Sequence, residues 1–423
     1  MLDLLRLATA GSVDDGKSTL VGRLLYDTKS VMADQLDDVH RASVDKGLST
    51  PDLSLLVDGL RSEREQGITI DVAYRYFATP RRSFVLADTP GHVQYTRNTV
   101  TGASTAQLAV LLVDARKGIV EQTRRHAAVV ALLGVPRLVL AVNKIDLIDY
   151  RREEFEVIAI DFEAFASGLG YGPDAVRSIP VSALGGDNVV DRSDRTPWYD
   201  GPTLLEHLET VPVEPEPADT PFRFPVQYVI RPRTPEYPDY RGYAGQVAAG
   251  TIRPGDEVVV LPAGMRTTLA RIDTPDGELP EARAGESVTL ILSDDIDVAR
   301  GDLIAAVASA PRVTDEFDAT VAWLGDRPLA PGARVLVKHG ARTTPAIVGE
   351  LSARLDEQTL AIVPDPGSLS LNEIGRVRVR TAEPLAVDDY ATVPRTGAFL
   401  VIDPSDGTTL AAGLVGAGLP GLC

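Results

Sequence analysis

The chain has 423 residues, 44% hydrophobic and 24% charged, with 42 Lys and Arg against 60 Asp and Glu, so its formal net charge is −18. This composition excludes a wholly disordered chain and leaves apolar material for more than one core. The acidic balance argues against a non-specific nucleic-acid binder, which needs a basic footprint, and we expect no nucleic-acid partner.

The single cysteine and the apolar runs bear on where the protein works. Cys423 alone cannot form an internal disulfide, which favours a reducing compartment. Charged residues interrupt the N-terminal run MLDLLRLATAG, unlike a signal peptide. The longest apolar stretch, 129–142, contains Pro136 and Arg137 and falls short of the ~20 residues that cross a bilayer. We therefore expect a cytoplasmic protein with no membrane partner.

Residues 1–211 alternate apolar strands with helical patterns. We expect strands at LLRLATA, SFVLADTP, LAVLLVDA, RLVLAVNK and RSIPVSA, and helices at 16–26, 93–105, 121–134, 151–169 and 202–210. Strands with near-continuous apolar runs, joined by helices, indicate a parallel sheet covered on both faces. Residues 1–211 are therefore predicted to form one α/β domain.

The pattern of apolar and polar residues changes after residue 211. Residues 212–221 hold four prolines and three acids, which indicates an extended linker. Beyond it, short alternating strands are separated by Gly, Pro and Asp turns, with a second junction near 308–312. We expect two all-β barrel domains, residues 222–308 and 312–412, followed by a glycine-rich tail at 413–423.

A phosphate-binding loop lies between the first predicted strand and helix. The residues GSVDDGKS fit G-x-x-x-x-G-K-[ST] in the context that this motif requires. Backbone N–H groups of the loop and the helix N-terminus favour a phosphate chain, with Lys17 at the β- and γ-phosphates and Ser18 on Mg²⁺. The predicted nucleotide-binding residues here are Gly11, Ser12, Val13, Asp14, Asp15, Gly16, Lys17, Ser18 and Thr19.

The sequence NKID, residues 143–146, selects the base. A carboxylate at Asp146 can accept hydrogen bonds from guanine N1–H and its N2 amino group, a donor pair that adenine lacks. Asn143 can bond the base N7 and brace the phosphate loop, and the Lys144 stem can lie along the base. After the next predicted strand, Ser182 and Ala183 are expected to bring a backbone N–H to guanine O6.

Two further segments have the features of γ-phosphate sensors. Asp88, Thr89, Pro90, Gly91 and His92 follow a predicted strand. We expect Asp88 to hold Mg²⁺, Gly91 to touch the γ-phosphate and His92 to orient the attacking water. In GITI, residues 67–70, Thr69 is expected to offer its hydroxyl to Mg²⁺ when the γ-phosphate is present. The predicted catalytic residues are Lys17, Thr69 and His92, and the predicted metal ligands are Ser18, Thr69 and Asp88.

The four motifs occur in the order found in GTP-hydrolysing domains, so the cofactors expected are GTP and Mg²⁺. With REQGITI, DTPGH and two barrels, the chain resembles the translation-factor class of GTPases. Longer segments, among them GSVDDGKSTLVGRLLYDTKSV, DTPGHVQYTRNTVTGAST, PWYDGPTLLEHLETV, DYRGYAG and SDDIDVARGDL, resemble the GTPase subunits of bacterial sulfate adenylyltransferase. Asp15 stands where elongation factors usually carry histidine.

This resemblance implies a specific function. GTP hydrolysis on the GTPase subunit would drive ATP and sulfate to adenosine 5′-phosphosulfate and pyrophosphate on a smaller catalytic subunit, which binds ATP and sulfate. The partners implied are that subunit and GTP or GDP, in a heterodimeric nucleotidyltransferase of sulfate assimilation.

Two alternatives remain open at this stage. The same domain plan suits an elongation-factor-like GTPase that delivers aminoacyl-tRNA, and it suits a regulatory GTPase with no partner enzyme. Two basic clusters, around 334–342 and 376–380, form either a solvated barrel face or a contact with an acidic partner. The remaining histidines lie in no motif and are assigned no role: His40, His126, His207 and His339.

Overall fold

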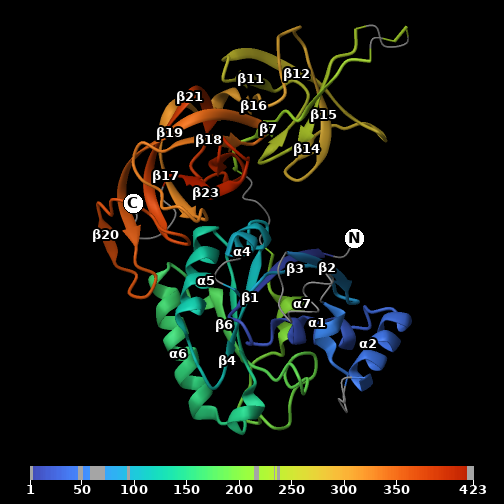
Figure 1. The fold of residues 1–423 in the computed structure, drawn as a ribbon. Coiled ribbons are helices and arrows are strands. Elements are labelled where there is room, and N and C mark those ends of the chain that lie inside the picture. Colours follow the sequence, from blue (N-terminus) through green and yellow to red (C-terminus); the bar gives the residue numbers. More distant parts are fainter. Residues whose placement is uncertain are drawn as a thin grey trace. The chain divides into compact units, whose positions relative to one another are not determined.

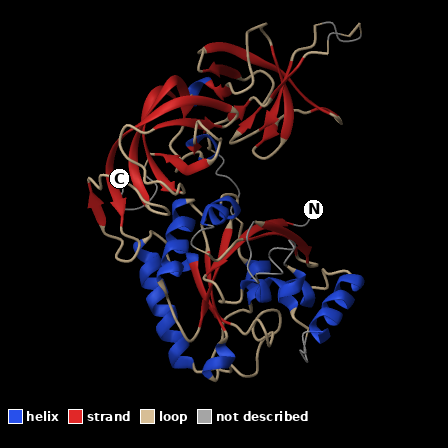
Figure 2. Cartoon of the chain, viewed as in Figure 1, coloured by secondary structure: helices blue, strands red, loops and turns tan. Residues whose placement is uncertain are grey.

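The structure is a computed structural model that describes residues 3–45, 51–57, 72–92, 96–213, 219–232, 234–235 and 239–416. The chain divides into two compact units. The first is Met1–Val213 with Asp356–Ala361, and the second is Glu214–Leu355 with Ile362–Cys423. Figure 1 traces the chain by colour, and Figure 2 shows that the long helices belong to the first unit. Over the described ranges, no helix combines the length and apolar character needed to cross a membrane.

A six-stranded sheet in the order β2-β3-β1-β4-β5-β6 forms the centre of the first unit. Its strands are β1 Asp3–Gly11, β2 Ala73–Ala78, β3 Arg82–Asp88, β4 Leu108–Asp114, β5 Leu138–Asn143 and β6 Val176–Pro180. β2 runs antiparallel to β3, and the other neighbours are parallel. Every residue of β4 is buried, as in a strand covered on both faces. The expected α/β domain is confirmed, with the edge strand β2 added.

Helices alternate with the strands of this sheet along the chain. They are α1 Lys17–Asp27, α2 Ala33–Asp45, α4 Thr96–Ala103, α5 Glu121–Leu132, α6 Arg152–Gly168 and α7 Leu204–Thr210, with short 3₁₀ turns η1 Leu53–Leu56, η3 Ile145–Ile148 and η4 Pro173–Ala175. The aliphatic faces of the strands and of α1 and α7 share one core. Sequence analysis named no helix at α2. β2 and β3 lie on one side of β1, whereas β4, β5 and β6 lie on the other. In open α/β sheets, the ligand crevice lies at the carboxyl ends of the strands where the chain changes sides in this way, here β1 and β4.

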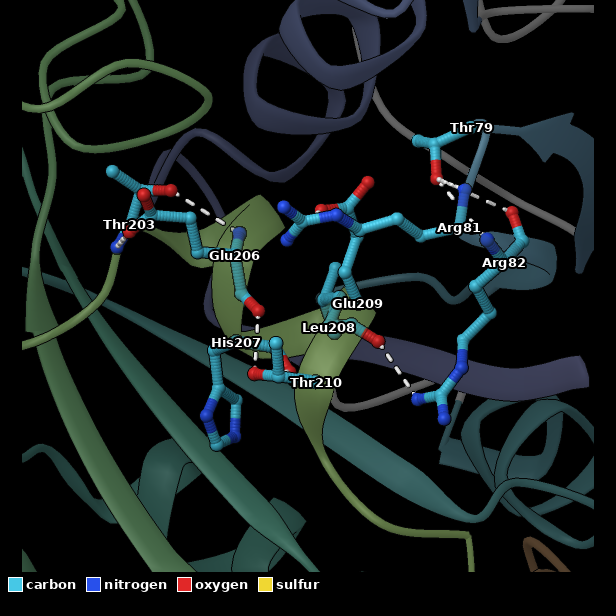
Figure 3. A network of polar contacts seen from close by, with 9 residues as sticks. All are labelled: Thr79, Arg81, Arg82, Thr203, Glu206, His207, Leu208, Glu209 and Thr210. Carbon is cyan, nitrogen blue, oxygen red and sulfur yellow. Dashed lines mark hydrogen bonds and ion pairs between the residues drawn. The ribbon is translucent and has the colours of Figure 1, made fainter.

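A polar network fixes the end of the first unit to the β2–β3 turn (Figure 3). Arg82 lies on β3 and donates hydrogen bonds to the carbonyls of Leu208 (3.0 Å) and Val211 (2.7 Å), at the C-terminal end of α7. The N-terminal end of α7 carries a capping box between Thr203 and Glu206. A cation at the helix C-terminus and a carboxylate at its N-terminus both suit the helix dipole, so this short helix is held at both ends.

The second unit begins with an eight-stranded sheet whose main path is β7-β16-β11-β12-β15-β9-β8. Its strands are β7 Arg223–Pro225, β8 Tyr228–Ile230, β9 Gly242–Gln246, β11 Glu257–Leu261, β12 Met265–Thr274, β13 Gly277–Glu278, β15 Ser287–Leu292 and β16 Leu303–Ala306; a separate pair is β10 Thr251–Ile252 and β14 Ala282–Arg283. The two ends of the path, β7 and β8, are separated by two residues, and β7 pairs with β16 while β8 pairs with β9. The sheet therefore curls back on itself around an apolar core.

The remaining strands close into a barrel. They are β17 Arg312–Trp323, β18 Arg334–His339, β19 Arg342–Leu355, β20 Ile362–Pro364, β21 Ile374–Val387, β22 Ala398–Ile402 and β23 Thr409–Val415, with η5 Val307–Ser309 before them and α8 Pro394–Gly397 between β21 and β22. Pairing of β18 with β19 closes the path β18-β22-β23-β17-β21-β19. The last strand includes Gly413, which the sequence analysis placed in the tail. A Cβ at Gly413 would collide with the ring of Phe399, so the strand packs there only without a side chain.

A buried ion pair joins the two sheets of the second unit. The Arg223 guanidinium donates to both carboxylate oxygens of Asp388 at 2.8 Å and to the Ser309 carbonyl at 2.6 Å. Thr396 donates its hydroxyl to the same carboxylate at 2.6 Å. Arg223 and Asp388 are both buried, so their charges are compensated by each other and by these hydrogen bonds.

Candidate nucleotide-binding site

The phosphate loop connects the end of β1 to the start of α1. The Ser12 N–H donates to the Asp15 carboxylate at 2.7 Å, which closes a tight turn. Burial raises the pKa of Asp15, and the Ser12 N–H and the nearby lysines oppose that rise. The structure records no acceptor, among the residues it describes, for a set of backbone N–H groups: those of Val13, Asp14, Gly16, Lys17, Ser18 and Thr19. Free N–H groups at a helix N-terminus form a site for an anion.

Two glycines are required by the geometry of this loop. Gly16 has a φ of 91°, and a Cβ there would collide with Nδ2 of Asn143. Gly91 lies against the loop, because its Cβ would collide with Nζ of Lys17 and fall 2.7 Å from the Gly11 carbonyl oxygen. The D-T-P-G segment is therefore in direct contact with the lysine that the sequence assigns to the phosphates.

Lys17 is folded into the loop. Its ammonium donates to the carbonyls of Gly11 (2.9 Å) and Ser12 (3.0 Å). Burial lowers the pKa of Lys17, and the carboxylates of Asp88 and Asp15 oppose that shift. A buried cation next to N–H groups without acceptors in the described part of the chain offers donors to a polyphosphate.

Asn143 links the phosphate loop to the base-side loop. Its Nδ2 donates to the Asp15 carbonyl at 2.7 Å, and its Oδ1 accepts from the Ala183 N–H at 2.9 Å. The Ile145 N–H donates to the Val181 carbonyl at 3.2 Å, which ties the NKID turn to the end of β6. Three strand ends, those of β1, β5 and β6, are thus braced through one buried amide.

Sequence reasoning missed Asp114 at the end of β4. This carboxylate is buried and accepts from Nε (2.9 Å) and Nη2 (2.6 Å) of Arg116 and from Lys144 Nζ at 3.0 Å. These hydrogen bonds lower the pKa of Asp114 well below its usual range, with that of Arg116 the strongest. Lys144 Nζ also bonds the Asp14 carbonyl, so Asp114 anchors the lysine against the phosphate loop. An acidic residue at the end of an apolar run, as at Asp88, is the signal that could have found it.

The D-T-P-G-H segment follows β3, the strand next to β1. Asp88 is fully buried and its Oδ1 accepts from the Thr9 hydroxyl at 2.8 Å. Thr89 donates its hydroxyl to the Thr9 carbonyl at 2.6 Å. Pro90 and Gly91 continue into His92, which is partly buried and comes directly after the glycine at Lys17. Thr69 and the rest of GITI lie outside the described residues.

The oxygen donors here fit Mg²⁺. Ser18, in the first turn of α1, and Asp88 offer hard oxygen ligands beside the phosphate loop. Within the described ranges no group of three or more His, Cys, Asp or Glu is placed to hold a metal ion. A cation at this place would take further ligands from phosphate oxygens and water, as Mg²⁺ does in nucleotide sites.

The base-side residues lie at the ends of β5 and β6. Asp146 is in η3 and partly exposed, and Ser182 is buried, with its N–H bonded to the Asp187 carbonyl at 3.1 Å. The Ala183 N–H is bonded to Asn143 Oδ1. The N–H groups of both residues that were expected to bring a donor to guanine O6 are therefore engaged within the protein in this structure.

Comparison with known families gives the class. The elongation factor Tu GTP binding domain matches residues 3–213, and the GTP-eEF1A C-terminal domain-like family matches residues 316–416. With the phosphate loop, the D-T-P-G segment and NKID at the carboxyl edge of one sheet, the chain belongs to the elongation factor Tu-like GTPases and binds GTP.

Three curated relatives narrow the family of this chain within that class. The bifunctional enzyme CysN/CysC of Mycobacterium tuberculosis (strain H37Rv) is 57% identical over 98% of this chain and 67% of its own. Sulfate adenylyltransferase subunit 1 of Salmonella typhi is 50% identical over 97% of this chain and 85% of its own. The bifunctional enzyme NodQ of Rhizobium meliloti (strain 1021) is 49% identical over 97% and 64%. The chain thus spans about two thirds of the bifunctional relatives, and it belongs to the sulfate adenylyltransferase subunit 1 family.

Proposed function

We propose that this chain is the GTPase subunit of a sulfate adenylyltransferase in sulfate assimilation. GTP hydrolysis at its phosphate loop would drive ATP and sulfate to adenosine 5′-phosphosulfate and pyrophosphate on a partner subunit that binds ATP and sulfate. The anhydride between phosphate and sulfate is a high-energy bond, so the reaction needs a driving force. The observation that carries the proposal is the set of free N–H groups at α1, braced by Asn143 to the base-side loop, in a chain 50% identical to a sulfate adenylyltransferase subunit 1.

The roles of the site residues are part of this proposal. Lys17 would hold the β- and γ-phosphates, and Asp146 would accept from guanine N1–H and the N2 amino group. Ser18, Thr69 and Asp88 would hold Mg²⁺, whose charge neutralises phosphate oxygens when it is bound. His92, one residue beyond the glycine at Lys17, would orient the attacking water.

Three wider features complete the proposal. We place the protein in the cytoplasm, because a single cysteine fits a reducing compartment. The name of the Salmonella relative, subunit 1, supports a partner subunit, and we propose that this partner is the smaller, catalytic subunit. The chain would work as three domains, residues 1–211, 222–308 and 312–412.

An aminoacyl-tRNA delivery role lacks comparable support. Two of the basic residues that could have met RNA have acidic partners: Arg378 pairs with Asp318 at 3.0 Å and Arg342 pairs with Asp302 at 2.9 Å. RNA binding needs cations that phosphates can reach and neutralise. The paired arginines fit a solvated barrel face better.

The test is reconstitution with the small subunit. GTP turnover is measured with and without the partner, ATP and sulfate, and pyrophosphate release from ATP plus sulfate is measured with and without GTP. We expect slow turnover of the chain alone and faster turnover in the complete mixture. His92→Ala should abolish the acceleration and preserve GTP affinity, whereas His40→Ala, at an exposed position of α2, should leave turnover unchanged. Equal GTP turnover in all mixtures would contradict coupling.

A further inference from the structure

An arginine on α1 reaches across to the base-side loop. The Arg23 Nε donates to the Ala183 carbonyl at 3.1 Å, and its Nη2 donates to the Leu184 carbonyl at 2.6 Å. The Arg23 side chain is 19% exposed and also lies 3.6 Å from the Asp27 carboxylate. The phosphate-binding helix and the loop after β6, 160 positions apart in sequence, are therefore joined by one guanidinium.

These contacts fix the direction of a neighbouring backbone donor. In a trans peptide the C=O and the following N–H point in opposite directions. Because the Ala183 carbonyl faces Arg23, the Leu184 N–H points away from it. Of the loop's N–H groups, that of Ala183 donates to Asn143 and that of Gly185 donates to the Ser182 hydroxyl at 3.1 Å. The Leu184 N–H has no acceptor within the part of the chain that the structure describes.

The base must lie beside this loop if NKID reads it. β5 and β6 are adjacent and parallel, with Val142 opposite Pro180, so the turns that follow them lie at the same edge. The Ile145 N–H bond to the Val181 carbonyl holds these two turns together. A purine whose N1–H and N2 amino group face Asp146 carries its O6 next to N1, on the same edge of the base.

We propose that Arg23 is a positioning residue for guanine recognition, which holds the Ala183–Leu184 peptide so that the Leu184 N–H donates to guanine O6. The proposal rests on the GTP site described above and extends it. Arg23 lies six residues after Lys17, about 9 Å along α1. One rigid helix thus sets the spacing between the phosphate end and the base end of the nucleotide.

The test compares two nucleotides that differ at O6. Calorimetry measures the affinity of the full chain for GDP and for 6-thioguanosine 5′-diphosphate, which keeps N1–H and the N2 amino group and carries sulfur, a weak hydrogen-bond acceptor, in place of O6. Arg23→Met should weaken GDP about tenfold, equal to about 1.4 kcal/mol, because a misdirected donor loses one hydrogen bond. The analogue should change by less than about twofold, since its sulfur accepts only a weak hydrogen bond.

Matched variants separate positioning from folding. Arg192 also donates to two carbonyls, those of Tyr199 (3.3 Å) and Gly201 (2.9 Å), so Arg192→Met should leave both affinities unchanged. Asp27→Asn removes the ion pair and should not change the GDP preference. Arg23→Lys keeps the charge and a donor, and it should recover part of the preference; it also serves as the test if Arg23→Met fails to fold.

Two results would overturn the proposal. Equal weakening of both nucleotides by Arg23→Met would mean that Arg23 only supports the fold, and unchanged GDP affinity would mean that it does not aim the donor. Failure of the native chain to bind GDP would instead defeat the proposed function itself.

Discussion

The buried amide of Asn143 gives the most direct prediction. Asn143→Ala removes two hydrogen bonds and leaves the Asp15 carbonyl and the Ala183 N–H without their partner. Each buried group left unpaired costs about 1–3 kcal/mol. Because the neighbouring Asp14 is exposed and water can reach the loop, we take about 3 kcal/mol for the two together. At about 2–4 °C per kcal/mol for a unit of this size, the melting temperature should fall by about 6–12 °C.

The same substitution should weaken nucleotide binding, since the phosphate loop and the base-side loop lose their connection. We expect the GDP Kd to rise about 10- to 100-fold, and calorimetry at a temperature where the variant is folded measures it. Asn143→Asp keeps the acceptor for Ala183 and loses the donor to Asp15, so it should fall between the native chain and the alanine variant in stability.

Asn188 supplies the matched control. It is another buried asparagine of the same unit, donating to the Pro180 carbonyl and the Thr196 hydroxyl, both at 2.9 Å, and accepting from the Ser193 N–H at 2.9 Å. Asn188→Ala should cost similar stability and leave GDP affinity within about twofold. If both variants weaken GDP equally, Asn143 acts through general stability and the reasoning is refuted.

Three further predictions follow from single side chains. Asp146→Asn should weaken GTP and favour xanthosine triphosphate, whose C2 oxygen accepts from the new amide; unchanged GTP preference in competition binding would refute the base assignment. Arg223→Met strands the buried Asp388 carboxylate and should cost about 3–5 kcal/mol in denaturant unfolding of the second unit, and a loss below about 1 kcal/mol would contradict the buried pair. Burial lowers the pKa of His126 to about 3, and the charges of Lys17 and Arg125 add to this effect. Below pH 6.5 the unfolded chain therefore binds a proton at His126, whereas the folded chain does not until the pH is near 3. The contribution of neutral His126 to stability should be full above pH 6.5 and fall as the pH drops toward 3. His126→Gln should therefore reduce the fall of melting temperature between pH 6.5 and 5. An unchanged slope of melting temperature against pH would refute this role of His126.

The nucleotide motifs could be found from the sequence because each is short and local. A strand, a tight turn and a helix are encoded by neighbouring residues, so GSVDDGKS and NKID are visible without a structure. Their placement at the same edge of the sheet follows from parallel pairing, seen in the register of Thr9 with Asp88 and of Asp114 with Asn143.

The supporting contacts could not be found in this way, because they join residues that are far apart in the sequence and meet only in the folded chain. Asp114 meets Lys144 across 30 positions and Arg23 meets the base-side loop across 160, and no local pattern encodes either pair. The strand β23 was missed for a different reason. Its alanines and glycines have weak strand propensity, and its place is set by packing of Gly413 under Phe399.

The central claim is that the cradle at α1 takes a guanine nucleotide whose base is chosen at Asp146. Calorimetric titration of the purified chain with GTP and with ATP, each with Mg²⁺, tests it most directly. The account predicts saturable binding of one GTP per chain and no saturable binding of ATP. Equal binding of the two nucleotides, or heat from neither, would contradict it.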